Sequence, residues 1–152
     1  YAGFWLRFIA YIIDDLIMGF AGFLISLPFI GGIIFSAIGI GKDPENTENL
    51  VKGIAGILGS ILGLVVLLVI LGWLYYALME SSKRQATLGK LALGLKVTDL
   101  EGNPISFARA TGRYFGKILS GMIMSIGYII AGFTQKKQAL HDILAGCLVV
   151  RK

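Results

Sequence analysis

The chain has 152 residues, of which 56% are hydrophobic and only 15% are charged. A soluble domain with a single core does not need this much apolar surface, so the composition excludes that class and indicates one integral membrane domain over residues 1–152. The net charge of +5 does not indicate a nucleic-acid partner, because Lys and Arg flank the apolar stretches instead of forming a stripe with exposed aromatic residues. Membrane lipids are the expected partner, with a basic face beside anionic head groups.

The first apolar stretch runs from Phe4 to Leu27, and another, Phe29 to Ile40, follows Pro28. Together they are longer than one bilayer crossing. We expect either a long helix that kinks at Pro28 or a span that ends there and is followed by an interfacial helix. The glycine pair just after the proline favours a kinked or broken helix.

Asp14 lies inside this first stretch. Counting 1.5 Å per residue from Phe4 places it about 15 Å into a hydrocarbon slab about 30 Å thick. A carboxylate at that depth costs about 2.5 to 3.5 kcal/mol on insertion scales, so it needs a partner, a proton or a water-filled cavity. Asp14 is therefore the best indication of function in the sequence.

A polar connection, residues 41–49, precedes the second apolar stretch, Leu50 to Met79. Trp73, Tyr75 and Tyr76 near its end predict an aromatic belt at the membrane interface. Small residues in its first half let another helix approach closely, which is consistent both with packing inside the fold and with a homodimer seam. These helix-packing residues are Gly53, Gly56, Gly59 and Gly63.

The chain contains a short internal repeat: residues 139–149, near its end, align with residues 87–97, in the polar region after the second span. Each copy predicts a short interfacial helix, a glycine stop and a short strand. We expect the two strands to pair, which requires both copies on the same side of the membrane. Between them, Ser106 is expected to cap a helix that begins amphipathic.

Basic residues predict the orientation of the chain. If the tail is cytoplasmic, only Lys42 and Lys52 lie outside, as the positive-inside rule favours. The apolar residues 118–133 are too few to cross twice, so they either form a re-entrant hairpin or cross once and leave the tail outside. A group of basic residues after the second span is expected to face lipid head groups: Lys83, Arg84, Lys90, Arg109, Arg113 and Lys117.

The expected fold is therefore an all-α membrane protein. It has two long transmembrane helices and a third spanning or re-entrant helical segment. Short interfacial helices and a small two-stranded pairing lie at the cytoplasmic face.

Three ordered blocks extend this interpretation. They read Gly3-Phe4-Trp5-x-Arg7-x2-Ala10-x3-Asp14, then Thr87-x-Gly89-Lys90-x3-Gly94-Leu95-x-Val97-x-Asp99-x2-Gly102 with Arg113-Tyr114, and finally Leu140-His141-Asp142-x3-Gly146-x2-Val149-Val150. With apolar spans between them, these blocks resemble the RDD family of small bacterial integral membrane proteins. The family takes its name from one Arg and two Asp, which map onto Arg7, Asp14 and Asp142.

The chain also departs from that family pattern. Leu88 stands where the family usually has Pro, Cys147 where it usually has Thr, and Asp15 is an added carboxylate. The resemblance implies a transporter of the bacterial inner (cell) membrane. Monovalent cation/proton exchange has been proposed for some members of the family.

Arg7 and Asp14 share a helix face, but they are about 10.5 Å apart along the axis, too far for a comfortable direct bond. Each is therefore expected to find a partner on another segment. For Arg7 we expect Asp142, in a bidentate pair that acts as a structural or gating latch between the tail and the first helix. His141 belongs to this latch, either as part of the tail anchor or as a pH sensor.

Asp14 then remains for a mobile ion, because a buried carboxylate can bind a proton or a cation but not both at once. Tyr11 and Asp15, one turn apart on a neighbouring face, are expected to supply further oxygen ligands. The alternative is that Asp14 is a protonated or hydrogen-bonded residue that holds helices together.

No enzyme is expected. The chain has one His and one Cys, so it lacks a metal-ligand cluster and an internal disulfide, and no catalytic residue set or cofactor motif is visible. Cys147 is expected to be a small packing residue. The expected function is small-solute transport by a homo-oligomer, in the form of monovalent cation/proton exchange. The alternative is a membrane scaffold or regulatory subunit that binds a partner through its basic cytoplasmic face.

Overall fold

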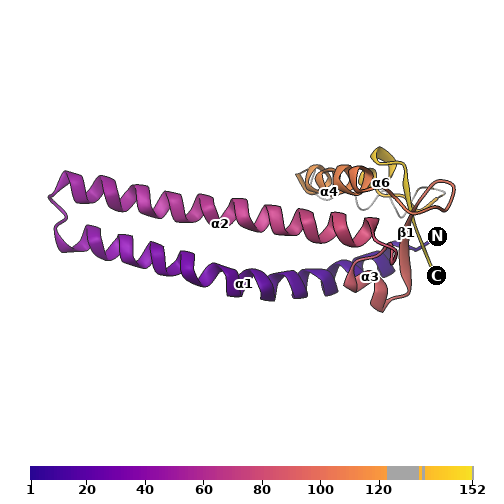
Figure 1. Cartoon of the computed structure of the whole chain (residues 1–152), viewed down its shortest axis with the longest axis horizontal. Coiled ribbons are helices and arrows are strands. Elements are labelled where there is room, and N and C mark those ends of the chain that lie inside the picture. The colour runs from indigo at the N-terminus through magenta and orange to yellow at the C-terminus, as the bar shows by residue number, and fades with distance from the viewer. Residues whose placement is uncertain (123–133, 135, 152) are drawn as a thin grey trace. The chain divides into compact units, whose positions relative to one another are not determined.

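The computed structural model describes residues 1–122, 134 and 136–151. The chain forms two compact units: a hairpin unit, Ile17–Leu71, and a terminal unit that joins Tyr1–Leu16 to Gly72–Lys152. In chain order the elements are α1 (Phe4–Lys42), α2 (Thr47–Ser81), α3 (Leu88–Ala92), β1 (Leu95–Asp99), α4 (Phe107–Met122), α6 (Leu140–Leu144) and β2 (Cys147–Arg151) (Figure 1). Helices α1 and α2 are each long and apolar enough to cross a membrane, which confirms the expected pair of long helices.

Helix α1 continues through Pro28 as one helix of 39 residues. Of the two alternatives at Pro28, one long helix is confirmed, and a span that ends there is wrong. Proline removes one backbone hydrogen bond and crowds the carbonyl four residues earlier, but apolar helices in membranes tolerate it when neighbouring groups satisfy the freed carbonyl. Helix α2 begins after Asn46, whose side-chain oxygen accepts the backbone N–H groups of Glu48 and Asn49 at 3.0 and 3.2 Å, a typical N-terminal cap.

The hairpin unit contains the four glycines expected to pack helices. A Cβ atom would lie 2.2 Å from α1 at Gly53, 2.3 Å from α1 at Gly56 and 3.1 Å from α1 at Gly63, in each case against a side-chain atom. Gly59 has nothing within 4 Å. Three of the four glycines therefore allow α1 and α2 of the same chain to pack closely, and Gly59 does not take part in that contact.

The terminal unit contains the repeat seen in the sequence. Helix α3 leads through Gly94 (φ +64°) into β1, and α6 leads through Gly146 (φ +60°) into β2. A positive φ is strained for residues with a Cβ atom, which explains why glycine stands at both stops. The two strands pair antiparallel with Val97 opposite Val149, so the predicted strand pairing is confirmed.

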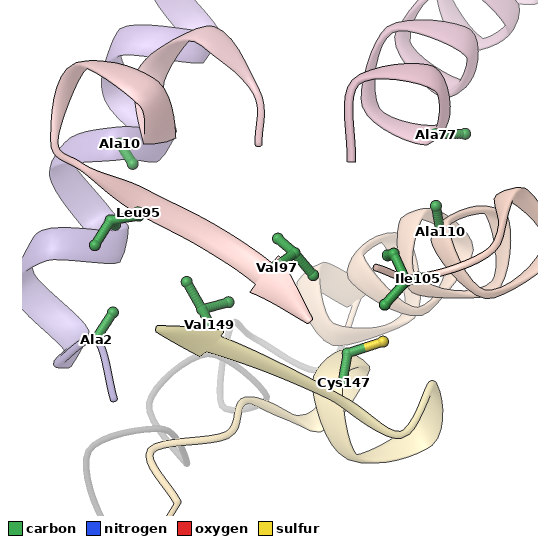
Figure 2. Close-up of a cluster of buried hydrophobic side chains, with 9 residues drawn as sticks. All are labelled: Ala2, Ala10, Ala77, Leu95, Val97, Ile105, Ala110, Cys147 and Val149. Atoms are coloured by element: carbon green, nitrogen blue, oxygen red, sulfur yellow. The ribbon is translucent and has the colours of Figure 1, made fainter. Parts of the chain in front are cut away.

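The apolar core of the terminal unit forms around this pair of strands (Figure 2). The backbone N–H of Ala2 donates to the carbonyl of Val149 at 2.8 Å, which fixes the start of the chain to β2. Cys147 is fully buried in this core, as expected for a packing residue. The members of the core are Ala2, Ala10, Ala77, Leu95, Val97, Ile105, Ala110, Cys147 and Val149.

Helix α4 is amphipathic with its polar side turned inward. Ser106 Oγ accepts the backbone N–H of Arg109 at 3.3 Å and so caps the helix as expected. Arg113 is 1% exposed, whereas Phe115, Ile118 and Leu119 are each more than 40% exposed. In a membrane protein an apolar outer face is suited to contact with lipid, and the polar face is free to build a buried site.

This inversion corrects the expectation for the basic residues after the second span. Lys90 and Arg113 are buried and Lys117 is mostly buried; none of the three faces lipid head groups. Lys83, Arg84 and Arg109 are exposed as expected. The prediction of a re-entrant hairpin or a third crossing over residues 118–133 stays untested, because residues 123–133 lie outside the described part of the chain.

The aromatic residues near the end of α2 also turn inward. Trp73 Nε1 donates to Thr111 Oγ1 at 3.0 Å, and the rings of Tyr76 and Tyr114 are 5.9 Å apart. Tyr75 contacts Asp14, as described below. These residues join α2 to its neighbours within the terminal unit instead of forming an outward-facing belt.

Candidate functional site

Asp14 is 1% exposed and accepts three hydrogen bonds in the terminal unit. Tyr75 OH donates to Oδ1 at 2.8 Å, Thr87 Oγ1 donates to Oδ2 at 2.6 Å, and the Gly89 backbone N–H donates to Oδ1 at 2.8 Å. All three donors are uncharged. None of the ion pairs between described residues includes Asp14, so this acid is satisfied by neutral groups alone.

Gly89 is the residue that makes this close approach possible. A Cβ atom there would lie 2.1 Å from the carbonyl oxygen of Ala10 and 3.0 Å from Cγ of Asp14. Any side chain would force α3 away from α1, because a backbone oxygen cannot yield as a flexible side chain does. Thr87 precedes α3 in an extended conformation, and its hydroxyl and the Gly89 N–H both point to Asp14, whereas the Leu88 N–H donates to the Tyr75 hydroxyl at 3.1 Å.

The length of α1 and α2 changes the expected depth of Asp14. Residues 16–41 contain no Asp, Glu, Lys or Arg, and this stretch is about 39 Å long at 1.5 Å per residue. Residues 53–79 are likewise free of charge, over about 40 Å. Either stretch exceeds a hydrocarbon core of about 30 Å. Each stretch alone is therefore long enough to span the slab, so neither helix requires Asp14 or Glu80 to lie at its middle.

Tyr11 and Asp15 were expected to complete the site around Asp14. Tyr11 is 48% exposed and Asp15 is also exposed. The three donors described for Asp14 come instead from α2 and from the segment that begins α3. A ligand role for Tyr11 and Asp15 stays a prediction. The hydroxyl oxygens of Tyr75 and Thr87, by contrast, lie within hydrogen-bond distance of the Asp14 carboxylate.

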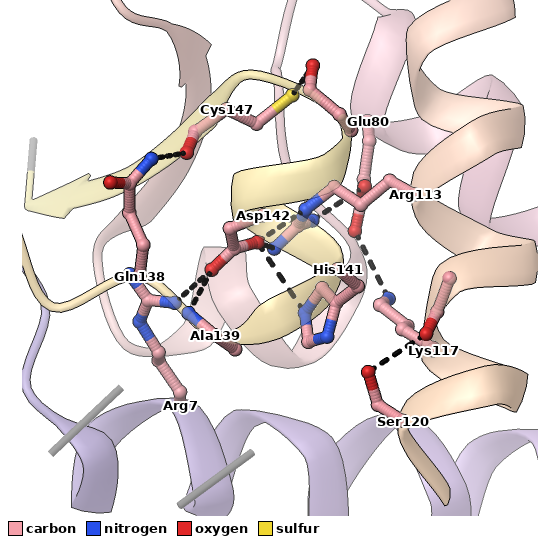
Figure 3. A network of polar contacts seen from close by, with 12 residues as sticks. Arg7, Glu80, Arg113, Lys117, Ser120, Gln138, Ala139, His141, Asp142 and Cys147 are labelled. Atoms are coloured by element: carbon pink, nitrogen blue, oxygen red, sulfur yellow. Dashed lines mark hydrogen bonds and ion pairs between the residues drawn. The ribbon is translucent and has the colours of Figure 1, made fainter. Parts of the chain in front are cut away.

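Asp142 is held in the opposite way, by cations (Figure 3). Arg7 Nη1 pairs with Oδ2, and Arg113 approaches Oδ1 with Nε at 2.7 Å and Nη2 at 2.6 Å. The Ala139 backbone N–H donates to Oδ2 at 3.1 Å, so the same carboxylate caps α6. The structure thus brings Arg7 and Asp142 together, but Arg7 contributes one nitrogen and the two-nitrogen contact belongs to Arg113.

Glu80 extends this network. Arg113 Nη1 donates to its Oε2 at 2.7 Å, and Lys90 pairs with its Oε1. Lys117 Nζ lies 3.4 Å from the same Oε1. Glu80 is 1% exposed, and Arg113 bridges it to Asp142, so the two acids and their basic partners form one buried charge network.

The surroundings of Asp142 and Arg113 keep both of these side chains charged. Burial opposes ionisation of Asp142, but Arg113 and Arg7 outweigh it and hold the pKa of Asp142 well below its usual range. Burial also disfavours the charge on Arg113, yet Asp142 and Glu80 raise the pKa of Arg113 above its usual value. The pair stays charged at every ordinary pH.

His141 lies beside this network, with Nε2 3.4 Å from Asp142 Oδ1. Burial lowers the pKa of His141 to about 3. Its backbone is close to α4, because a Cβ at Gly116 would lie 3.1 Å from His141 Cβ. The imidazole is therefore neutral near pH 7, which favours an anchoring role for His141 over a pH sensor.

Several residues of the site were not found from the sequence. Glu80 is the first residue after the second apolar stretch and no pattern around it singles it out, and Tyr75 is in the sequence only an interfacial aromatic. Thr87, Gly89 and Arg113 belong to the family blocks, so the sequence could have indicated that they are important. The blocks do not indicate which of these residues contact one another in the fold. Among the described residues no group of three His, Cys, Asp or Glu side chains is placed to hold a metal ion.

Comparisons with known proteins identify the family of the chain. The RDD family model matches residues 1–146. The chain is similar to YxaI of Bacillus subtilis (strain 168), described as an uncharacterized protein: 41% identity covers 99% of this chain and 97% of YxaI. It is also similar to YteJ of the same organism, described as an uncharacterized membrane protein: 33% identity covers 100% of this chain and 82% of YteJ. No solved structure matches. With a family match over nearly all of its length and two apolar helices that can cross a bilayer, the chain is a membrane protein that belongs to the RDD family.

Proposed function

We propose that the protein is a small-solute transporter of the bacterial inner membrane, and specifically an exchanger of a monovalent cation for a proton. The observation that carries the proposal is Asp14, a buried carboxylate that no described residue neutralises by an ion pair. A buried charge without an opposite charge is costly. A proton or a small cation removes that cost, and the two compete for the same oxygens.

The neighbours of Asp14 have suitable chemistry for a hard cation. Sodium and lithium prefer oxygen ligands, as other hard cations do. The hydroxyls of Tyr75 and Thr87 donate to Asp14 in the present arrangement, but a hydroxyl can rotate and offer a lone pair instead. The Gly89 N–H is fixed in the backbone and continues to hold the carboxylate. The two hydroxyls can thus change from hydrogen-bond donors to cation ligands without movement of a helix.

The position of the site defines its role in the exchanger. Asp14 lies where α1 leaves its long charge-free stretch, so it is a loading site at one membrane boundary. Two long helices can hardly enclose a pathway by themselves, and we therefore propose that the transporter is a homo-oligomer.

Reconstituted protein tests the proposal. Purified full-length chain in proteoliposomes should move sodium, lithium or protons when a pH gradient is applied. Asp14→Asn should abolish this flux, and Tyr75→Phe and Thr87→Val should raise the cation concentration needed for half-maximal flux. Asp43→Asn, in the exposed loop between the long helices, is the matched control and should behave as the parent protein.

The alternative function is a membrane scaffold or regulatory subunit, and one observation favours it. Three hydrogen bonds on Asp14 can simply tie α1 to α2 and to α3. The basic face that such a partner would use is smaller than the sequence indicated, because Lys90 and Arg113 are buried in ion pairs. Absence of flux for all three ions, together with a partner that co-purifies in fixed ratio, would favour this function.

A further inference from the structure

Lys117 occupies an unusual position in the buried charge network. It lies on the inward face of α4, one turn after Arg113, and its side chain is 15% exposed. Its Nζ atom is 3.8 Å from the centre of the Tyr76 ring. The same atom lies 3.4 Å from Glu80 Oε1 (Figure 3). The aromatic face and the carboxylate both favour an ammonium ion at this point.

Lys117 is nevertheless the basic partner that Glu80 holds most weakly. Arg113 contacts Oε2 at 2.7 Å, and Lys90 contacts Oε1 more closely than Lys117 does. One carboxylate is thus shared by three basic side chains. Coulomb attraction falls with distance, and the two nearer cations repel the third.

The charges that face the network from its surrounding elements are unequal. The basic groups are Arg7 from α1, Lys90 from α3, and Arg113 and Lys117 from α4. The acidic groups are Asp142 from α6 and Glu80 from α2, with Asp14 from α1 acting on Lys90; His141, from α6, is neutral near pH 7.

Among these described groups the basic side chains exceed the acidic ones by one. If Lys117 gives up its proton, the charges balance. Arg7 and Arg113 cannot release a proton in this way, because a guanidinium group does not lose a proton in proteins.

Burial lowers the pKa of Lys117 to about 7; Glu80 opposes this shift, and Lys90 and Arg113 add to it. Burial likewise lowers the pKa of Lys90, but its close contact with Glu80 counteracts the shift. Lys117 is therefore the lysine of the network whose burial is less well offset by a close carboxylate.

We propose that Lys117 is a second proton-binding site of the exchanger, separate from Asp14, where a proton and a cation compete. This inference rests on the proposed function and adds a second group that carries a proton. In the loaded state Nζ holds three protons. Release of one to water leaves a neutral amine and lowers the charge of the network by one. Lys90, which pairs with Glu80 and is attracted by Asp14, links the two sites: loss of the Lys117 proton favours entry of a cation at Asp14.

The first measurement titrates Lys117 directly and needs no transport. The full-length protein in detergent is acetylated by a brief pulse of acetic anhydride at a series of pH values, and modification of each lysine is followed by mass spectrometry. After normalisation to its own plateau, the reaction of Lys117 should be half-maximal near pH 7. Exposed Lys83 serves as the internal reference for a lysine outside the network. A midpoint for Lys117 that coincides with that of Lys83 would overturn the proposal.

The second measurement uses Lys117→Arg, which keeps a positive charge but cannot release a proton. Its sodium flux in proteoliposomes should fall at least tenfold below that of the parent protein, while its unfolding temperature stays close to the parent value. Lys83→Arg is the matched control and should leave the flux unchanged. An unchanged flux and pH profile in Lys117→Arg would refute the proton site while leaving exchange by Asp14 intact. Conversely, a Lys117 that titrates near pH 7 in a protein without flux would refute exchange, and with it the role of Lys117 in an exchanger, and would leave only the titration of Lys117 itself.

Discussion

Two buried acids of the terminal unit, Asp14 and Asp142, are held in opposite ways. Asp142 lies between two guanidinium groups and has its charge fully balanced. Asp14 has two hydroxyls and one backbone N–H, which satisfy its oxygens without balancing its charge. An acid whose charge is balanced by fixed arginine side chains does not require a mobile cation. The comparison teaches that full hydrogen bonding and charge neutrality are separate requirements, and that only the acid that lacks the second is suited to exchange ions.

The strongest test of this comparison removes each charge in turn. Asp142→Asn leaves Arg7 and Arg113 without their shared counter-ion and should destabilise the protein by about 3–5 kcal/mol. Asp14→Asn keeps an acceptor oxygen in place and should cost about 1–3 kcal/mol. Unfolding by denaturant in detergent micelles measures both values. If Asp14→Asn proved the more damaging of the two, Asp14 would be a structural lock, and the exchange proposal would lose its basis.

A second test probes how tightly the Asp14 site is built. Gly89→Ala introduces a Cβ atom that would lie 2.1 Å from the Ala10 carbonyl oxygen, and overpacking of this kind should cost about 1–3 kcal/mol. Gly112→Ala is the matched control, because a Cβ there meets nothing within 4 Å, and it should be neutral or stabilise α4 by up to about 1 kcal/mol. The same unfolding measurement compares the two variants, and equal stability would show that α3 does not approach α1 as closely as described.

A third test concerns pH and is confined to the narrow range between pH 6.5 and pH 5. The pKa of His141 is lowered to about 3 in the folded protein, whereas an unfolded histidine titrates near pH 6.5. The unfolded chain therefore binds the extra proton first, so stability is complete above about pH 6.5 and falls toward pH 3, by up to about 1.4 kcal/mol per pH unit. The unfolding temperature of the parent protein should drop between pH 6.5 and pH 5.

His141→Gln provides the comparison for that pH effect, since His141 is the single histidine of the chain. The variant should lose the drop between pH 6.5 and pH 5, where most carboxylates have not begun to titrate. Parallel pH profiles of the two proteins would show that His141 is protonated in the folded state and belongs to the charged network after all.

The sequence by itself determined the parts of this protein that depend on local chemistry. The two apolar stretches predicted α1 and α2, and the glycine stops at residues 94 and 146 predicted two helix–strand units, because a positive φ is a local demand that glycine meets. The family blocks indicated that Arg7 and Asp142 matter. At Pro28 the sequence left a continuous helix and an interrupted one open, because a proline can be tolerated inside a membrane helix when neighbouring groups satisfy the missing bond.

Only the tertiary structure decided what surrounds each charge. Periodicity shows that α4 has a polar and an apolar face, but not that the polar face turns inward to place Arg113 between Glu80 and Asp142. The donors of Asp14 likewise come from segments more than sixty positions away along the chain. A partner at such separation leaves no pattern in the local sequence, and the distinction between a neutralised acid and an exchangeable one depends entirely on those partners.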